Sequence, residues 1–367
     1  MAEIKNAKKF KVQRFGRTRD DRVHRIVTSG VLLRFLWVNS AVLRPQQQDG
    51  ALSPLPNLPI TGGVGPMVLA ASGKSLYANT GSPSVISGYL IQPNGSLAPL
   101  PGSPFSAAGG SFGIDPLGRY LYVTGGTVLA AGASTVSAYQ IGATGALTPV
   151  PGSPFASGTY PISVTVDPFG RFVYVANFGS KNISAYRILE NGTLMPVPGS
   201  PFAIQGFGQP ITLAVEPSGR FPYAANFGAA NISSYRIGPN GALAPLAGSP
   251  TPVGGAFYQS MALDPGGGFL EVLEGESGLV SFHINNTTGI LEAEPEIVTG
   301  NDPFALAVDP LGKFVYVANA NRTPNIGPIS LSGYQIGPKG ALKTVPGSPF
   351  VPSVPTGSFP TSVVIAR

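Results

Sequence analysis

The chain of 367 residues contains no cysteine and only two histidines, His24 and His283. A disulfide framework, a cysteine-based zinc site, a thiol nucleophile and an iron–sulfur cluster are therefore excluded. Any imidazole chemistry has to use one of two positions that lie far apart in the sequence. Because thiol-free chains occur in every compartment, the missing cysteine does not reveal where the protein resides.

Charged residues are scarce as well, at 11% of the chain, and they are unevenly distributed. The formal net charge of +6 lies wholly in residues 1–25, where nine basic residues stand against three acidic ones. The other 342 residues carry 14 basic and 14 acidic groups, so a basic face for nucleic acid is not expected. Residues 1–25 are predicted to be a disordered arm or to precede the true start of translation, although such an arm could also contact phosphate or anionic lipid.

Long apolar runs are missing too. The most apolar stretch, Ile26–Leu43, is interrupted by Arg34 and Asn39, so it is not expected to span a membrane. No small-residue cleavage site follows it cleanly, which leaves a secretory signal weakly supported. The aromatic and β-branched residues of Phe35–Val38 favour a buried strand that is retained in the fold.

Glycine and proline, in contrast, are abundant, with 49 and 38 residues, and they come with an apolar content of 43%. This mixture suits short strands joined by tight turns and is poor material for helices. The apolar content is high enough for a large core, so a disordered polymer is excluded along with a helical bundle, a coiled coil and a collagen.

Two sequence markers repeat along the chain with one period. Turn glycines recur every 45 to 52 residues, at Gly73, Gly118, Gly170, Gly219, Gly267 and Gly312. The tripeptide Gly-Ser-Pro recurs after 47 to 50 residues, and once after about twice that distance, beginning at Gly102, Gly152, Gly199, Gly248 and Gly347. A shared period of this length indicates a repeat architecture.

The repeat Pro161–Phe202 shows how each unit is expected to fold. Its first strand ends in Asp-Pro-Phe-Gly, which predicts a type I turn from Asp167 to Gly170. The second strand is continuously apolar, so both of its faces must be covered. Asn191-Gly192 predicts a two-residue hairpin turn with positive φ at both residues, and the fourth strand is expected to end at Pro-Gly-Ser-Pro, where proline stops further pairing.

These units predict an all-β fold, a seven-bladed β-propeller of four-stranded antiparallel blades. Six full repeats start near Pro66, Gly109, Pro161, Pro210, Tyr258 and Pro303. Pro360–Ala366 matches only a first strand and Asp49–Pro56 only a fourth strand. We therefore expect the N- and C-terminal segments, residues 28–57 and 360–366, to share the seventh blade and close the ring. Residues 26–367 then form a single domain.

Tyr-Val-Ala-Asn occurs at Tyr174–Asn177 and Tyr316–Asn319, with Asp-Pro-x-Gly-Arg/Lys-Phe before it and Ser-x-Tyr-x-Ile after it. In these motifs, over residues 49–366, the chain resembles the YVTN repeats of the lactonase family of seven-bladed propellers. The resemblance implies a hydrolase similar to the propeller-type 6-phosphogluconolactonases, with carboxymuconate cyclases as relatives. Because the repeated residues are turn and core residues, the resemblance is more specific for fold than for chemistry.

Active members of that family begin the innermost strand with Pro-His, and this chain departs from the pattern. The matching positions hold no histidine: they are Gly110, Ile162, Ile211, Gln259, Phe304 and Thr361. His283 falls in a third strand, where other repeats have arginine, and is interpreted as a partly exposed strand residue.

The candidate site lies on the face that carries the variable loops after each second strand. Glu274 replaces a repeated Asn and Glu271 a repeated Tyr, and a buried carboxylate with a raised pKa could act as a general base on water. The alternative is that this repeat has merely drifted. The candidate substrate contacts are Arg322 for an anion and, as polar lining, Asn177, Asn226, Asn319, Tyr160, Gln209, Gln259 and Asp302; the asparagines could instead only cap loops.

Two functions stay open at this point. The first is a lactonase-like hydrolase that acts on a sugar lactone such as 6-phosphogluconolactone, with no cofactor and no metal. The second is a non-catalytic propeller that binds a protein or glycan partner at the cell envelope, which the missing histidines and the low charge favour. We expect a monomer without a nucleic-acid partner or a transmembrane segment. The resemblance points to a periplasmic or extracellular protein, but no convincing signal peptide supports it.

Overall fold

The computed structural model describes residues 35–366, with gaps at 39–40, 46–48, 55–63, 82–83, 94–95, 107–109, 126–133, 255–259, 275–277, 321–329 and 352–362. Residues Leu33–Arg367 form one compact unit. The predicted arm, residues 1–25, lies outside the described residues. Within them, the one helical element is a short 3-10 turn, Pro338–Gly340, and no helix is long and apolar enough to cross a membrane.

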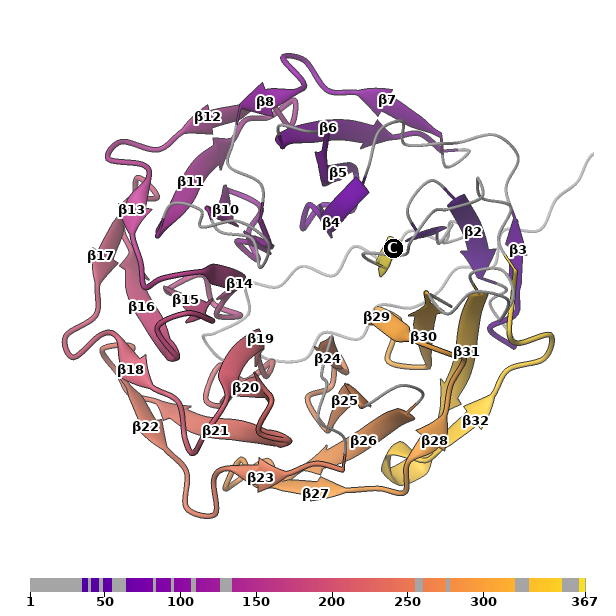
Figure 1. Cartoon of the computed structure of the whole chain (residues 1–367). Helices are drawn as coiled ribbons and strands as arrows, with labels where there is room; N and C mark the ends of the chain where they lie inside the picture. The colour runs from indigo at the N-terminus through magenta and orange to yellow at the C-terminus, as the bar shows by residue number, and fades with distance from the viewer. Residues whose placement is uncertain are drawn as a thin grey trace, which may run out of the picture. The chain divides into compact units, whose positions relative to one another are not determined.

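Six blades are built from consecutive strands and follow one another in chain order (Figure 1). Blades one and two contain β4 (Val64–Leu69), β5 (Ser75–Thr80), β6 (Val85–Ile91), β7 (Leu97–Pro99) and β8 (Phe105–Ser106), then β9 (Phe112–Ile114), β10 (Tyr120–Thr124), β11 (Thr135–Ile141), β12 (Leu147–Pro149) and β13 (Phe155–Ala156). Blades three and four contain β14 (Pro161–Val166), β15 (Phe172–Asn177), β16 (Asn182–Ile188), β17 (Leu194–Pro196) and β18 (Phe202–Ala203), then β19 (Gln209–Val215), β20 (Pro222–Phe227), β21 (Asn231–Ile237), β22 (Leu243–Pro245) and β23 (Thr251–Pro252). Blades five and six contain β24 (Met261–Leu263), β25 (Phe269–Glu274), β26 (Gly278–Ile284), β27 (Leu291–Ala293) and β28 (Ile297–Val298), then β29 (Pro303–Val308), β30 (Phe314–Asn319), β31 (Ser330–Ile336) and β32 (Leu342–Thr344).

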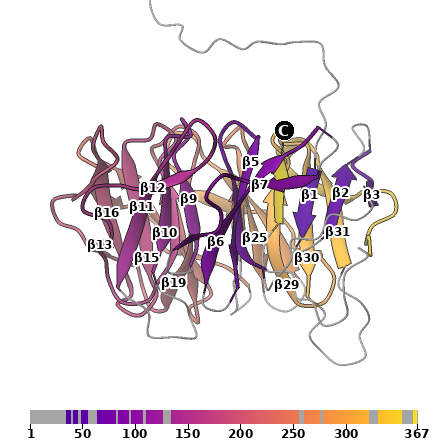
Figure 2. The ribbon, with the colours of Figure 1, turned by 90° about the horizontal axis from the view of Figure 1, so that it is seen from above.

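The first four strands of each of these six blades form an antiparallel sheet in chain order, which confirms the predicted propeller architecture of four-stranded antiparallel blades, and blades one to five add a short fifth strand. Because successive strands alternate in direction, the turn after strand one and the hairpin after strand three lie at one end of the strands, and we call this end the turn face. The loop after strand two and the link to the next blade lie at the other end, the loop face. Figure 2 shows the strands side-on, running between these two faces.

The turns at the turn face explain why the markers repeat. In blade three the amide of Gly170, at a φ of 64°, donates to the Asp167 carbonyl oxygen, which is the predicted turn. The Asp167 carboxylate accepts the amide of Phe172 at 2.8 Å and so fixes the start of β15. The expectation for Asn191-Gly192 is wrong in one respect, because only Gly192 has a positive φ. The amide of Gly192 bonds back to the Leu189 carbonyl oxygen, so a longer hairpin loop places a single left-handed glycine before β17.

The Gly-Ser-Pro segments do not end the blade, contrary to the prediction. After Pro201 the chain returns, and the short strand β18 pairs with β16 through Phe202 and Ala203. Corresponding fifth strands pair with the third strands of blades one, two, four and five. The proline therefore marks a change of partner within the sheet rather than the end of pairing.

A further described sheet joins the two ends of the chain. It contains β1 (Phe35–Val38), β2 (Ala41–Pro45), β3 (Leu52–Pro54) and β33 (Val363–Ala366) in the order β3-β2-β1-β33. We call it the composite sheet. β33 pairs antiparallel with β1 and contacts β4 and β29, the first strands of blades one and six. The two terminal fragments therefore lie in one sheet, with the C-terminal strand at its inner edge, as the sequence predicted.

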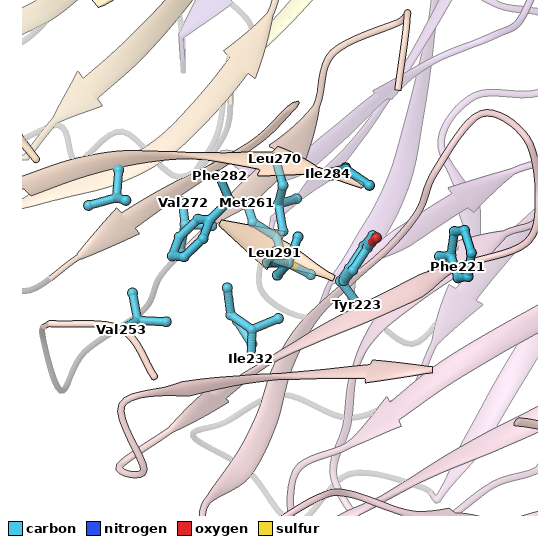
Figure 3. Packing of buried hydrophobic residues seen from close by; sticks show 12 residues of the cluster. Phe221, Tyr223, Ile232, Val253, Met261, Leu270, Val272, Phe282, Ile284 and Leu291 are labelled. Atoms are coloured by element: carbon cyan, nitrogen blue, oxygen red, sulfur yellow. The ribbon is translucent and has the colours of Figure 1, made fainter. Parts of the chain in front are cut away.

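The core lies between neighbouring blades. In Figure 3, Tyr223 and Ile232 of blade four pack against Leu270, Val272 and Phe282 of blade five, and all five side chains are almost completely buried. Every residue of the second strand of blades three and six is buried, as the continuous apolar runs required. Hydrogen bonds add to this packing, since Tyr174 Oη donates to the Gly241 carbonyl oxygen of the next blade at 3.0 Å.

Candidate functional site

Four equivalent positions bring polar side chains to the loop-face ends of the second strands. Asn177 pairs with Asn182 in blade three, and the same register position is filled in blades four, five and six by Asn226, Glu274 and Asn319. The two strands of each pair are held together along their whole length, so the backbone fixes where these side chains begin. We call this set the strand-end polar set.

The three asparagines of this set are fully buried, and only the side-chain nitrogen of each has hydrogen-bond partners among the described residues. Asn177 Nδ2 donates to Asn182 Oδ1 and to Ser184 Oγ, both at 2.8 Å, and Asn226 repeats this arrangement with Asn231 and Ser233. In blade six, Asn319 Nδ2 donates to Ser330 and Ser332. The Oδ1 atom of each of the three asparagines has no partner among the described residues. A buried acceptor without a partner is costly, so each is a position at which water or a ligand hydroxyl would be stabilised.

The serines that complete these contacts were not among the predicted site residues. Ser184, Ser233 and Ser332 lie in the third strands, two residues before a repeated tyrosine. The repeated Ser-x-Tyr pattern was the available signal, but it does not say which side chain a serine meets across the sheet.

Glu274 is the acidic member of the strand-end polar set. Its side chain is 4% exposed, and Oε1 accepts the amide of Gly254, from the segment that follows β23, at 3.3 Å. The segment 275–277 that follows it is outside the described residues. The structure thus places a buried carboxylate at the loop-face end of β25, where blades three, four and six present an asparagine amide.

Glu271 lies on the same strand but in different surroundings. It is fully buried, and its Oε1 accepts a hydrogen bond from Ser281 Oγ at 3.1 Å while Oε2 has no partner among the described residues. Burial raises the pKa of this carboxyl to about 8. Because residues three apart on a strand point to opposite sides of the sheet, Glu271 and Glu274 are not brought together as a pair of carboxylates.

The links that lead into the first strands of blades three, four and six lie beside the strand-end polar set at the loop face. Tyr160 and Asp302 have φ values of 50° and 51°, and their carbonyl oxygens accept the amides of Phe178 and Ala320 at 2.9 and 2.8 Å. Gln209 begins β19 and pairs with Phe227. All three side chains are half-buried beside the strand ends. A left-handed conformation at a non-glycine residue is uncommon, and here it turns the link directly into the blade.

A bulge then displaces the residue that follows the proline in blades three, four and six. The register shifts between Pro161 and Ser163, and the same shift recurs after Pro210 and Pro303. Bulges re-aim a side chain relative to its sheet, and this is the position where the family pattern has histidine. The bulged residues here are the half-buried Ile162, Ile211 and Phe304. In blades three, four and six, this position therefore supplies apolar surface and no imidazole.

The other predicted site residues lie away from the strand-end polar set or outside the described residues. His283 pairs with Phe269 and Glu292 in the third strand of blade five, and its ring lies 5.7 Å from the Phe269 ring, away from the strand ends. Arg322, Gln259 and Thr361 lie outside the described residues, as does His24. Among the described side chains, no cluster of three or more histidine or acidic residues is arranged to hold a metal ion.

The comparisons with known proteins agree with this architecture. A family model described as "Lactonase, 7-bladed beta-propeller" matches residues 110–200, whereas no curated protein matches the chain. The structure of a periplasmic gluconolactonase from Pseudomonas aeruginosa is similar, with 22% identity and a TM-score of 0.74 over 91% of this chain and 99% of the other. A Bacteroides uniformis protein provisionally named as a 6-phosphogluconolactonase has 18% identity and a TM-score of 0.75 over 91% and 99%. A protein from Lactobacillus plantarum has 18% identity and a TM-score of 0.72 over 92% and 100%.

At these identities the solved structures show the fold and leave the chemistry open. Their names describe those proteins, and the fold is shared over at least nine-tenths of this chain. The family match over residues 110–200 confirms the resemblance to the lactonase propellers that the repeated turns and strands predicted.

Proposed function

We propose that this protein is a lactone hydrolase that binds a sugar lactone at the loop face. The observation that carries the proposal is the buried carboxylate of Glu274, at the register position where blades three, four and six have asparagine. Glu274 accepts a proton from water as the water oxygen adds to the lactone carbonyl carbon. The ring C–O bond then breaks, the ring oxygen takes up a proton, and a hydroxy acid is released.

The neighbouring polar groups orient the substrate in this proposal. The unpaired Oδ1 atoms of Asn177, Asn226 and Asn319 hold water or accept sugar hydroxyls just inside the loop face. Tyr160, Gln209 and Asp302 line the links beside them, and Gln259 continues this series in the sequence. Arg322 is the proposed contact for a phosphate or another anionic group, because guanidinium groups bind such oxygens in a bidentate manner. Glu271 is assigned no part in the reaction, because it points to the opposite side of the sheet.

Hydrolysis of 6-phosphogluconolactone and of glucono-δ-lactone by the full chain, with spontaneous hydrolysis subtracted, tests the proposal. Glu274→Gln is expected to lower kcat by at least about a hundredfold, the usual contribution of a general base. Glu292→Gln, which removes an exposed carboxylate from the outer strand of the same blade, is the matched control and should retain activity. Retained activity in Glu274→Gln with an unchanged unfolding temperature would show that Glu274 is not the general base.

The second candidate function is the binding of a glycan or protein partner without catalysis. The apolar bulge residues Ile162, Ile211 and Phe304 favour it, because this position is where the related enzymes place imidazole. Absence of turnover on several δ-lactones, together with saturable glycan binding that Asn226→Ala weakens, would select this function.

We also propose that the composite sheet acts as the seventh blade and closes the ring. Tyr316 Oη donates to the Gly50 carbonyl oxygen at 2.8 Å, as Tyr174 does to Gly241 between blades three and four. Leu52, Val363 and Ile365 pack in one cluster with Tyr316 of blade six. The composite sheet thus makes with blade six the tyrosine contact that blade four makes with blade three, which supports its place in the ring.

A further inference from the structure

A repeated aromatic residue fills the turn-face end of most blade interfaces. The residue at the start of the second strand, or just before it in blade four, packs on the hairpin glycine of the next blade so closely that a Cβ on that glycine would not fit. The pairs are Tyr120 with Gly192, Phe172 with Gly241, Phe221 with Gly289, Phe269 with Gly340 and Phe314 with Gly50. Each ring therefore occupies the space directly against its hairpin glycine.

The interface between blades one and two lacks this aromatic residue. Ser75 occupies the position, since it pairs with Leu90 as Phe172 pairs with Arg187. The nearest atoms to the hairpin glycine here, Gly145, belong to the Leu100 side chain and the Ser75 hydroxyl. A cavity of about 620 Å³ lies beside this hairpin, and we call it the blade-one cavity. Its volume is in the range that small-molecule ligands occupy.

Blade one also lacks the acidic residue that opens the turn after the first strand in the other five blades. In blades two and three an arginine after the turn is bound by the acidic residue that opens the turn: Arg119 lies 2.8 Å from Asp115, and Arg171 2.9 Å from Asp167. The corresponding positions in blade one hold Lys74 and Ala70, so the lysine has no such partner. Lys74 lines the cavity, and none of the described lining residues is acidic.

The rest of the lining is mostly apolar with a few hydroxyl groups near the lysine. Leu90, Leu117 and Ile141 line the cavity from strands and turns of both blades. Ser72, Ser75 and Thr144 add hydroxyl groups. A site with an exposed lysine, hydroxyl groups and aliphatic walls, and with no carboxylate among its described lining residues, is suited to a molecule with an anionic end and an apolar body.

We propose that the blade-one cavity binds a small organic carboxylate with an apolar ring system, with its carboxylate at Lys74. The cavity opens at the turn face, so it is separate from the loop-face site and does not depend on the proposed hydrolase activity. Blades one and two lie side by side in Figure 1, with β6 and β11 flanking the interface. Blade one differs from the other five blades at two positions of this site, with Ser75 in place of an aromatic residue and Ala70 in place of a carboxylate.

Titration of the full chain with 2-naphthoate, followed by its fluorescence, tests the proposal, with 2-naphthamide as the neutral analogue of the same shape. We expect saturable binding of the carboxylate that is at least fivefold tighter than binding of the amide. Ser75→Phe restores the repeated aromatic residue and should abolish binding of both probes. Lys74→Met should weaken 2-naphthoate at least fivefold and leave 2-naphthamide unchanged, and Ala70→Asp should act in the same direction by pairing with Lys74.

Lys313→Met is the matched control, because Lys313 has the same place in blade six but is accompanied by Asp309 and Phe314. It should leave both affinities unchanged. The unfolding temperature of each variant verifies that it is folded, and Ser75→Phe is expected to fold because five other interfaces contain the aromatic residue. Absence of saturable 2-naphthoate binding, or equal binding by wild type and folded Ser75→Phe, would overturn the proposal.

Discussion

Glu271 occupies a position at which five other blades carry tyrosine, namely Tyr77, Tyr122, Tyr174, Tyr223 and Tyr316. The tyrosine hydroxyl reaches the hairpin of the next blade in blades one, three, four and six, whereas the shorter carboxyl of Glu271 meets only Ser281 among the described residues. Burial favours its neutral form, which is why its pKa is raised. The residue therefore couples folding to pH.

We expect the stability of the protein to fall as pH rises because of this residue. Between an unfolded pKa of 4.5 and a folded pKa of about 8, the folded chain holds one proton more than the unfolded chain. The free energy of unfolding then decreases with pH by up to about 1.4 kcal/mol per unit. Glu271→Gln, which resembles the neutral acid, should remove this slope in urea titrations from pH 5 to pH 8. An identical slope in wild type and variant would show that Glu271 ionises normally in the folded protein.

Tyr122 allows a second test at the same position of the repeat. Its hydroxyl is buried without a partner among the described residues, whereas the Tyr174 hydroxyl donates to Gly241. Tyr174→Phe should cost about 1 kcal/mol of unfolding free energy, and Tyr122→Phe should be neutral or stabilising, because it removes an unsatisfied polar group. Chemical denaturation of both variants gives the comparison, and an equal loss in the two would contradict it.

The Gly-Ser-Pro segments stabilise a whole strand, the third strand of each blade that contains the motif. In five blades the serine hydroxyl accepts an amide of the third strand at 2.9–3.0 Å, from Gly88, Ala138, Ala185, Ser234 and Gly333. The fourth strand is only three residues long, so this bond and the short fifth strand complete the pairing of the third strand. The motif therefore stabilises the outer edge of blades one, two, three, four and six.

Ser200→Ala should destabilise the protein by about 1–2 kcal/mol, because the buried amide of Ala185 loses its partner. Thr148→Ala, at an exposed position of the outer strand of blade two, is the control and should change the unfolding free energy little. Guanidinium unfolding curves measure both. A Ser200→Ala variant as stable as the control would mean that water replaces the serine without cost.

The same elements show what could be predicted from the sequence. Turns such as Asp167–Gly170 depend on neighbouring residues, so their spacing was enough to predict the blades and the shared terminal sheet. The return of the chain after Pro201, the contact between Asn177 and Ser184, and the cavity beside Ser75 depend on strands or blades that meet only after folding. A single replaced residue in the sequence does not say which neighbouring side chain it leaves without a partner, so these features required the structure.

At the scale of the whole molecule, stability depends on how the two ends of the chain meet. β33 pairs with β1 over Phe35–Val38 and contacts the first strands of both flanking blades. Because β33 lies against both flanking blades, its loss would affect two blade interfaces at once. In the closed ring that we propose, no free end exists at which the repeats could fray, so loss of a terminal strand should affect the whole molecule.

Deletion of residues 360–367 is therefore expected to cause a large loss of stability rather than a local change. Without β33 the inner edge of the composite sheet is open, and an unpaired edge promotes association between chains. The deleted protein should show a lower unfolding temperature and form higher-order species in light scattering. Deletion of Arg367 alone, which lies beyond β33, should leave both measurements unchanged. A deletion variant as stable and as monodisperse as this control would mean that the ring does not close through the C-terminal strand.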